Sequence, residues 1–213
     1  MKTGILFDLD GTLLNTLEDL ADGLNHTLGQ FGYPVRTLEE VRRFVGNGAA
    51  KLIQRAVPEG AEPMPVLAAF RSYYDAHCRV KTKPYEGVVD AIMELGKEYP
   101  LAIVSNKPDS AVKSLCADYF PGIYARGEST DCARKPAPDM VRKAMAAIGV
   151  ESCVYVGDSE VDVATARNAG VRCLAVLWGF RDREELEAAG AKHFCENPAD
   201  LPRAVADLLA PST

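Results

Sequence analysis

Short apolar runs alternate with amphipathic segments over most of the chain. The runs are apolar at successive positions, which is typical of strands buried on both faces of a parallel sheet, and they span residues 5–7, 101–104, 154–156, 171–176 and 191–195. The amphipathic segments repeat their apolar residues with helical spacing, and they span residues 88–98, 110–119, 138–148, 160–168, 184–189 and 199–209. This alternation predicts an α/β fold in which helices cover both faces of a parallel sheet.

The region of residues 15–83 breaks the alternation, because it has helical periodicity and no convincing strand. Four helices are predicted there: over residues 17–28, from Thr37 (where Glu40 completes a capping box), and over residues 49–57 and 66–80. We therefore expect an α/β core domain of residues 1–14 and 84–213, interrupted by a helical domain of residues 15–83. The chain would cross twice between these two units, which indicates a hinge.

The composition is that of a globular protein, with 213 residues, 47% of them hydrophobic and 25% charged, and a net charge of −6. Proteins that bind nucleic acid or anionic membranes normally show clustered Lys and Arg, so the acidic balance argues against both partners. A small molecule or a protein is the more fitting partner.

No segment reaches the roughly 18 uninterrupted apolar residues of a membrane span, and the run at residues 5–7 is too short for the core of a signal peptide. We expect a cytoplasmic protein, either a monomer or a homodimer. The six cysteines are widely scattered and form no C-x-x-C pair, which favours free thiols over disulfides or a zinc site.

Polar residues follow three of the predicted strands. Asp8 and Asp10 come after the first strand, Ser105 after the second and Asp158 after the third. Ligands of open α/β sheets bind at this carboxyl edge. Two acids one residue apart on a strand would point to opposite faces, but Gly11 gives the backbone the freedom to curl past the strand end. The curl would bring both carboxylates to one site.

Four motifs in this order carry a resemblance to a known family. Asp8-Leu9-Asp10-Gly11-Thr12 resembles the nucleophile motif of the haloacid dehalogenase-like (HAD) hydrolases. Ser105 resembles their second motif, Lys135-Pro136 their third, and Gly157-Asp158-Ser159-Glu160-Val161-Asp162 their fourth. The similarity covers nearly the whole chain, and it implies a Rossmann-like core that carries an inserted α-helical cap.

Further segments are similar to the phosphoglycolate phosphatase branch of that family. They are Val45-Gly46-Asn47-Gly48-Ala49, Ser105-Asn106-Lys107, Lys135-Pro136-Ala137-Pro138 and Ala166-Arg167-Asn168-Ala169-Gly170. The resemblance implies a phosphatase that acts on a small phosphorylated metabolite, with phosphoglycolate first among the candidates.

The residue types suit this chemistry. A carboxylate can attack a phosphoryl group, and Asp8 is the expected nucleophile. The repulsion between Asp8 and a phosphate dianion calls for a hard divalent cation with oxygen ligands, for which Mg²⁺ is suited. We expect the side chains of Asp8 and Asp158 and the backbone carbonyl of Asp10 to bind Mg²⁺. Asp162, four residues after Asp158, would reach a metal-bound water or orient Lys135.

Asp10 is the expected general acid and base. It would protonate the leaving alkoxide and then take a proton from the water that hydrolyses the aspartyl-phosphate, so it has to carry a proton when substrate binds. Ser105 would donate to a phosphoryl oxygen, and Lys135 would neutralise charge on the transferring group. Asn106 would contribute its backbone N–H group.

The helical domain offers further candidates for substrate binding. Gly46 and Asn47 could present backbone amides or a side chain to an anion, although an ordinary turn between helices is an equal possibility. Arg55 could meet a substrate carboxylate or simply be solvated. Many cap-bearing relatives have an acid before Ser or Thr where this chain has Asn15-Thr16, so a charge at the hinge is missing.

Two alternative functions remain open. A phosphomutase would return the phosphoryl group to a sugar instead of water, but mutase relatives usually carry a His-containing segment soon after the first motif, and this chain lacks one. The chain could also be a non-catalytic protein that binds a phosphorylated ligand. The intact Asp8, Asp10, Lys135 and Asp158 argue against this reading.

Overall fold

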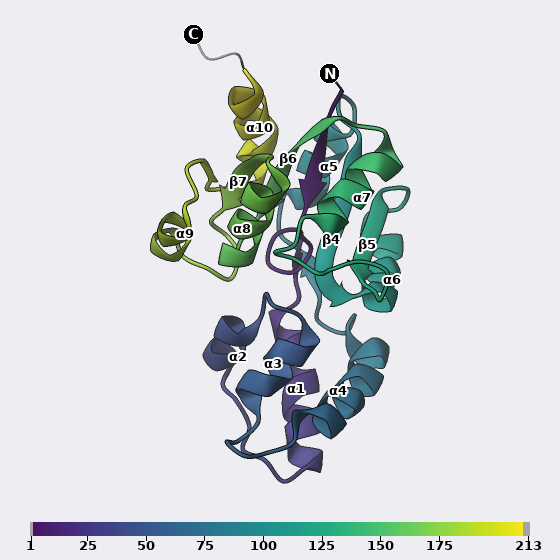
Figure 1. The fold of residues 1–213 in the computed structure, drawn as a ribbon, viewed down its shortest axis with the longest axis vertical. Coiled ribbons are helices and arrows are strands. Elements are labelled where there is room, and N and C mark those ends of the chain that lie inside the picture. Colours follow the sequence, from purple (N-terminus) through teal and green to yellow (C-terminus); the bar gives the residue numbers. More distant parts are fainter. Residues whose placement is uncertain (1, 211–213) are drawn as a thin grey trace.

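The computed structural model describes residues 2–210, and a six-stranded sheet forms its centre (Figure 1). All neighbouring strands pair in parallel, in the order β5-β4-β1-β6-β7-β8. The strands are β1 (Thr3–Phe7), β4 (Leu101–Pro108), β5 (Tyr124–Glu128), β6 (Ser152–Gly157), β7 (Arg172–Val176) and β8 (Phe194–Cys195). The predicted α/β fold with a parallel sheet is confirmed.

The register of the central strands places the polar residues that follow them at one level. Phe7, the last residue of β1, pairs with Ile103 on one side and with Val156 on the other. All three side chains are fully buried, as their continuous apolar runs indicated. The residues that follow them therefore emerge side by side at the carboxyl edge of the sheet.

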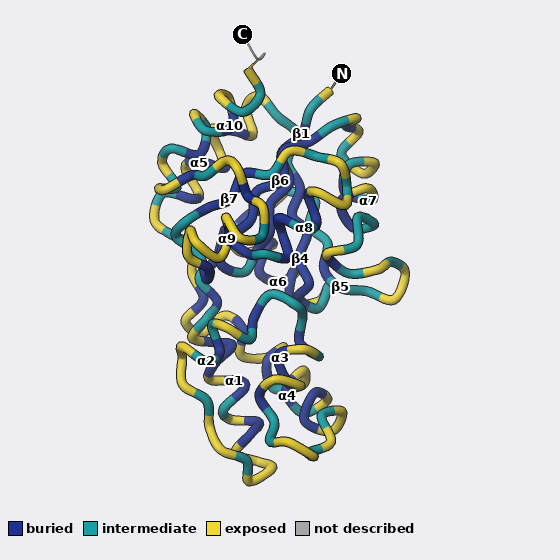
Figure 2. Tube along the Cα trace, turned by 60° about the vertical axis from the view of Figure 1, so that its left-hand side comes forward, coloured by how far each residue is buried: buried dark blue, intermediate teal, exposed yellow. Residues whose placement is uncertain are grey.

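Helices cover both faces of the sheet, which Figure 2 shows as a buried layer between more exposed helices. On one face, Ile92, Leu115 and Val205 pack in the same cluster as Phe7. They belong to α5 (Val88–Leu95), α6 (Asp109–Tyr119) and α10 (Leu201–Leu209), which the short helix η1 (Pro198–Asp200) precedes. The other face is covered by α7 (Asp139–Ile148), α8 (Glu160–Ala169) and α9 (Arg183–Ala189).

A helical segment, residues 17–77, lies beyond the carboxyl edge of the sheet (Figure 1). Its helices are α1 (Leu17–Gln30), α2 (Leu38–Phe44), α3 (Ala49–Ala56) and α4 (Pro63–His77). Leu24, Ile53 and Phe70 are buried within it. The predicted capping box is present at the start of α2, where Thr37 Oγ1 accepts from the N–H of Glu40 and Glu40 Oε2 accepts from the N–H of Thr37.

The two chain crossings between sheet and helical segment are joined to each other. The short strands β2 (Leu14–Asn15) and β3 (Lys83–Pro84) pair antiparallel. The buried carboxylate of Asp19, in the first turn of α1, accepts hydrogen bonds of 2.9–3.0 Å from the backbone N–H groups of Lys81 and Thr82. The crossings therefore form one connection, stabilised by buried polar contacts.

The structure differs from the sequence prediction at a few elements. The edge strand β5 was not predicted, because Tyr124-Ala125-Arg126-Gly127-Glu128 has only two apolar residues. The helix predicted over residues 66–80 spans Pro63–His77 instead, and the strand predicted over residues 191–195 shortens to Phe194–Cys195. The six cysteines are free thiols, as expected. Within residues 2–210, no helix combines the length and the apolar character that crossing a membrane requires.

Replacing Asp19 tests the connection between the crossings. Asp19→Ala removes the acceptor of two backbone N–H groups, and losing such a partner typically costs about 1–3 kcal/mol. We expect a decrease of this size in the free energy of unfolding, measured with urea. Asp22→Ala, on the same helix, removes only an exposed ion pair with Lys81; it is the control and should change stability by less than about 1 kcal/mol. Equal stability of the two variants would contradict the assignment.

Candidate active site

The chain curls immediately after β1. The N–H of Asp8 still donates to Val156 O at 2.9 Å, whereas the N–H groups of Leu13 and Leu14 both donate back to Leu9 O at 3.0 Å. Gly11 takes a φ of +85°, in the left-handed region that favours glycine. As a result, Asp8 and Asp10 line the same cavity, which encloses about 50 Å³ between the strand ends and the helical segment.

Lys135 lies among buried acids at this edge. Its ammonium nitrogen is 2.8 Å from Asp8 Oδ1, 2.8 Å from Asp162 Oδ1 and 3.0 Å from the hydroxyl of Tyr155. The second oxygen of Asp162 accepts from the backbone N–H and the hydroxyl of Ser159 at the start of α8. Since protein donors reach both of its oxygens, Asp162 serves to hold Lys135 against Asp8.

Asp158 is fixed from two sides. Its Oδ1 accepts from the Thr12 hydroxyl at 2.9 Å, and its Oδ2 accepts from the N–H of Phe180 at 2.8 Å. A Cβ on Gly11 would lie 2.2 Å from Asp158 Oδ2, so only glycine allows this approach. Burial raises the pKa of the Asp158 carboxyl to about 7, and repulsion from Asp162 adds to the increase.

The acidic cluster of Asp8, Asp158 and Asp162 has the properties of a cation site. Each residue offers a carboxylate oxygen within 4.8 Å of the others. Burial, followed by repulsion from Asp162, raises the pKa of Asp8 well above its usual range. Asp8 Oδ1 is buried, and although it lies close to Lys135, no residue among 2–210 gives it a hydrogen bond of ordinary geometry. The Lys135 ammonium contacts two of these three carboxylates, so a hard divalent cation fits the remaining negative charge and the oxygen ligands.

Asp10 is held by one of its two carboxyl oxygens. Oδ1 accepts from the Thr16 hydroxyl at 2.6 Å and from the Lys107 ammonium at 2.8 Å. Within the described part of the chain, no hydrogen bond occupies Oδ2. This second oxygen is therefore the one on which a transferable proton can reside.

Ser105 and Asn106 line the cavity but differ in what they can contact. The Ser105 hydroxyl accepts from the N–H of Lys107 at 3.2 Å, and its own proton remains available for a ligand. The Asn106 side chain accepts from the N–H of Lys135 and donates to Lys135 O, both at 2.9 Å, and it also donates to Gly46 O. The amide of Asn106 thus positions Lys135 and is not free to bind substrate.

Of the predicted substrate-binding residues in the helical segment, some lie at the cavity and others do not. Gly46 lines the cavity, as does Gly48, but Asn47 is not among the lining residues. Asn47 Oδ1 accepts from Arg55, whose other nitrogen donates to Phe44 O, both at 2.7 Å. Arg55 and Asn47 therefore stabilise the turn between α2 and α3, and the expected substrate contact of Asn47 finds no support in this geometry.

Arg181 is a site residue that the sequence did not reveal. It is buried in the loop after β7, and Glu160 Oε2 accepts from its Nε at 2.9 Å. Its Nη atoms donate to the carbonyls of Arg42 and Val45 at the end of α2, at 3.0 and 2.8 Å. An arginine in a loop gave no signal in the sequence, because its partners lie about 140 residues away. Arg181 joins the sheet to the helical segment.

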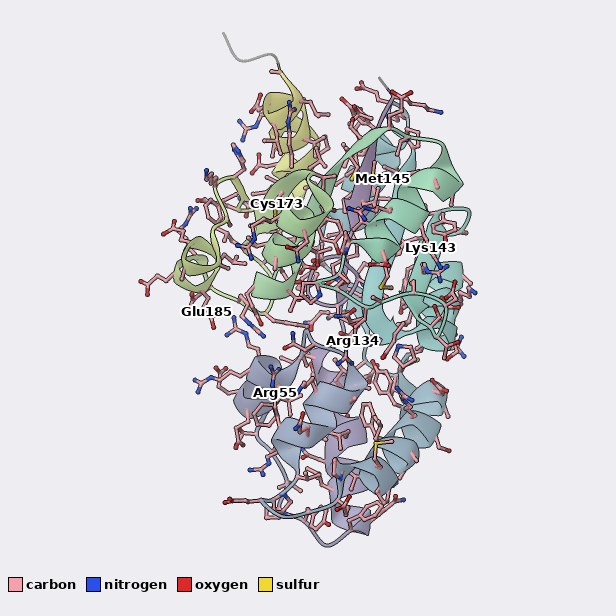
Figure 3. All side chains as sticks on the ribbon, in the orientation of Figure 1. Arg55, Arg134, Lys143, Met145, Cys173 and Glu185 are labelled. Carbon is pink, nitrogen blue, oxygen red and sulfur yellow. The ribbon has the colours of Figure 1, made fainter. Side chains whose placement is uncertain are left out.

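The sheet and the helical segment also meet at a second set of contacts. Glu128, at the end of β5, is 3.8 Å from Arg71 of α4 and 3.7 Å from Arg134. Figure 3 shows Arg134 where the two parts meet, and a Cβ on Gly48 would lie 3.6 Å from its Nη1. The helical segment is thus closed over the strand ends.

The family follows from comparison with known proteins. A family model described as haloacid dehalogenase-like hydrolase matches residues 5–176, which include Asp8, Ser105, Lys135 and Asp158. The chain belongs to the haloacid dehalogenase-like hydrolase family. This membership confirms the resemblance stated from the four motifs.

Relatives with assigned functions place this HAD-like hydrolase among phosphatases. It is 34% identical to phosphoglycolate phosphatase 1 of Pseudomonas aeruginosa, over 92% of this chain and 77% of that protein. It is 35% identical to the phosphoglycolate phosphatase of Mesorhizobium japonicum, over 89% of this chain and 90% of that one. The chain is accordingly a phosphoric monoester hydrolase similar to phosphoglycolate phosphatases.

Solved structures agree with this placement. A protein of Lactobacillus delbrueckii subsp. bulgaricus, provisionally named a phosphoglycolate phosphatase, superposes with a TM-score of 0.90 at 36% identity, over 96% of this chain and 99% of that one. CbbY of Rhodobacter sphaeroides, solved in complex with phosphate, superposes with a TM-score of 0.78 at 25% identity, over 97% of this chain and all of that one.

The acidic cluster predicts that divalent metal stabilises this HAD-like hydrolase. Mg²⁺ at about 100 times its dissociation constant should raise the free energy of unfolding by about 2.7 kcal/mol. Thermal unfolding with and without Mg²⁺ measures the effect, and calorimetric titration measures binding directly. Asp158→Asn should lose the response, whereas Glu59→Gln, an exposed change, should keep it. An undiminished response of Asp158→Asn would contradict the assignment of the cluster.

The hydrogen bonds of Arg181 lead to a prediction about how readily the helical segment opens. Arg181→Ala removes the hydrogen bonds to the end of α2, so the helical segment should open more readily. We expect limited proteolysis at the crossings to become about 10- to 100-fold faster, because hydrogen bonds of charged groups contribute about 1.5–3 kcal/mol. Arg167→Ala, an exposed change on α8, is the control. If Arg181→Ala were cleaved as slowly as the wild type, Arg181 would not hold the two parts together.

Proposed function

We propose that the protein is a Mg²⁺-dependent phosphatase that hydrolyses a small, phosphoglycolate-like phosphate monoester through an aspartyl-phosphate intermediate. The observation that carries this proposal is the placement of two different carboxylates at one cavity. Asp8 lies beside Lys135 and the other buried acids, whereas Asp10 lies beside Thr16 and Lys107 and keeps one oxygen available. One carboxylate is suited to attack and the other to proton transfer. The names of the relatives support the choice of substrate.

The metal would be held by the side chains of Asp8 and Asp158 and by the backbone carbonyl of Asp10. Asp162 would act indirectly, because both of its oxygens already accept from protein donors. When bound, Mg²⁺ supplies positive charge that offsets the repulsion between these carboxylates and a phosphate dianion.

In the first half-reaction, a carboxylate oxygen of Asp8 attacks phosphorus, and the bond between phosphorus and the ester oxygen breaks. Asp10 donates its proton to the departing oxygen, so the alcohol leaves in neutral form. Lys135, 2.8 Å from Asp8, compensates negative charge around the transferring group, and the free hydroxyl proton of Ser105 is directed to a phosphoryl oxygen.

In the second half-reaction, water attacks the phosphorus of the aspartyl-phosphate. Asp10, now deprotonated, accepts a proton from this water, and the bond between phosphorus and the Asp8 oxygen breaks. Inorganic phosphate is released, and both aspartates return to their starting protonation states. Asp10 therefore serves as acid in one step and base in the other.

Residues 15–83 would act as a cap domain over a core of residues 1–14 and 84–213. The helical segment supplies mostly apolar side chains to the cavity, among them Leu20, Leu52 and Phe70. Such a wall excludes bulk water from the strand ends and strengthens the electrostatic interactions there. The contacts of Arg181 and Glu128 across the junction support a closed state of this kind.

The nucleophile is tested by Asp8→Asn, in a phosphate-release assay over small esters with and without Mg²⁺. An amide cannot replace the carboxylate as nucleophile, so kcat/KM should fall on the order of 10⁴-fold or more. The panel includes phosphoglycolate, sugar phosphates, nucleotides and pyrophosphate. Asp118→Asn, an exposed change on α6, is the control and should leave activity unchanged.

Substantial activity in Asp8→Asn would contradict the mechanism. If the wild-type protein released no phosphate from any ester, a non-catalytic binding role would be favoured instead. Transfer of the phosphoryl group to a second hydroxyl of a sugar, without release of phosphate, would favour a phosphomutase.

A further inference from the structure

The hydroxyl proton of Tyr74 is buried at the cavity and has no acceptor within residues 2–210. Tyr74 belongs to α4, its exposed fraction is 2%, and it lines the same cavity as Asp8 and Asp10. The Lys107 ammonium is close enough to donate to the hydroxyl oxygen. A buried donor without an acceptor lowers stability, so an acceptor supplied by a ligand would account for its presence. Burial also raises the pKa of Tyr74, which keeps the hydroxyl a neutral donor.

Lys107 lies beside this hydroxyl. Its ammonium is 4.7 Å from the centre of the Tyr74 ring and 2.8 Å from Asp10 Oδ1, and the side chain is buried. An ammonium group has three N–H donors. In the described part of the chain, Asp10 Oδ1 and the nearby Tyr74 hydroxyl oxygen can accept from Lys107 Nζ, which leaves one N–H donor for a ligand.

Arg181 is a second cation at the cavity wall, but its N–H groups already donate to protein acceptors and are not available to a ligand. Its Nε donates to Glu160, and its Nη atoms donate to backbone carbonyls at the end of α2. The nearby wall of the helical segment is apolar, with Phe70 and Leu52 among its members. Within residues 2–210, the side chains with free donors on this side of the cavity are thus those of Tyr74 and Lys107.

We propose that the Tyr74 hydroxyl and the Lys107 ammonium form a subsite for a carboxylate on the leaving group of the substrate. The inference rests on the proposed function, in which Asp10 donates its proton to the ester oxygen. Since Lys107 contacts Asp10 directly, a carboxylate one carbon beyond the ester oxygen reaches its ammonium. Within the phosphoglycolate-like substrate already proposed, Tyr74 and Lys107 would therefore be the residues that recognise the carboxylate.

The test compares two substrates that share the ester and differ in the carboxylate: 2-phosphoglycolate and ethyl phosphate. The readout is the ratio of their kcat/KM values, in which any effect of Lys107 on Asp10 cancels. Tyr74→Phe should lower this ratio about tenfold, and Lys107→Met about 10- to 100-fold, as is typical for hydrogen bonds to a charged group. Tyr73→Phe, the neighbouring residue on α4, is the matched control and should leave the ratio unchanged.

Thermal unfolding separates this role from a structural one. The Tyr74→Phe variant should unfold at a temperature close to that of the wild type, because its hydroxyl proton has no acceptor among residues 2–210 to lose. If both variants kept the wild-type ratio while hydrolysing both esters, the subsite would be overturned and the proposed function would stand. If the wild-type enzyme hydrolysed neither ester, both proposals would be overturned.

Discussion

The ion pairs of Lys135 are the interaction on which the rest of the site depends. Three carboxylates within 4.8 Å of one another would repel strongly in a buried environment, and one ammonium lies 2.8 Å from two of them. The protein fixes that ammonium from several directions. Asn106 holds the backbone of Lys135, and Asp162 is itself fixed by Ser159 at the start of α8. The remaining negative charge is what makes a divalent cation fit.

The helical segment adds to this arrangement what the sheet cannot provide by itself. The strand ends bring acids, a serine and lysines to one edge, but that edge would be open to water. Arg181 joins the end of α2 to the loop after β7, so closure and the completed cavity depend on the same contacts. Within residues 2–210, the buried hydroxyl proton of Tyr74 has no acceptor, and Tyr74 lies beside the lysine that contacts the proposed acid. Substrate choice would thus be shared between Tyr74 of the helical segment and Lys107 of the sheet.

The sequence predicted the features that local patterns encode. Continuous apolar runs located the central strands, and the Asp8-to-Thr12 motif located the loop after β1. The edge strand β5 escaped prediction, because few of its residues are apolar. The roles of Arg181, Tyr74 and Asn47 could not be predicted either. Their hydrogen-bond partners, or the lack of one, are decided by tertiary packing, whereas periodicity reports burial alone.

The most direct test of the central claim, that Asp8 becomes phosphorylated, is chemical trapping during turnover. Borohydride reduces an acyl phosphate of aspartate to homoserine, so mass spectrometry of the N-terminal peptide reports the intermediate at a defined residue. We expect homoserine at position 8 when enzyme, Mg²⁺ and substrate are all present, and unmodified aspartate when substrate is omitted. Unmodified aspartate at position 8 while phosphate is being released and the reductant is in excess, or homoserine at position 10 or 158, would contradict that claim.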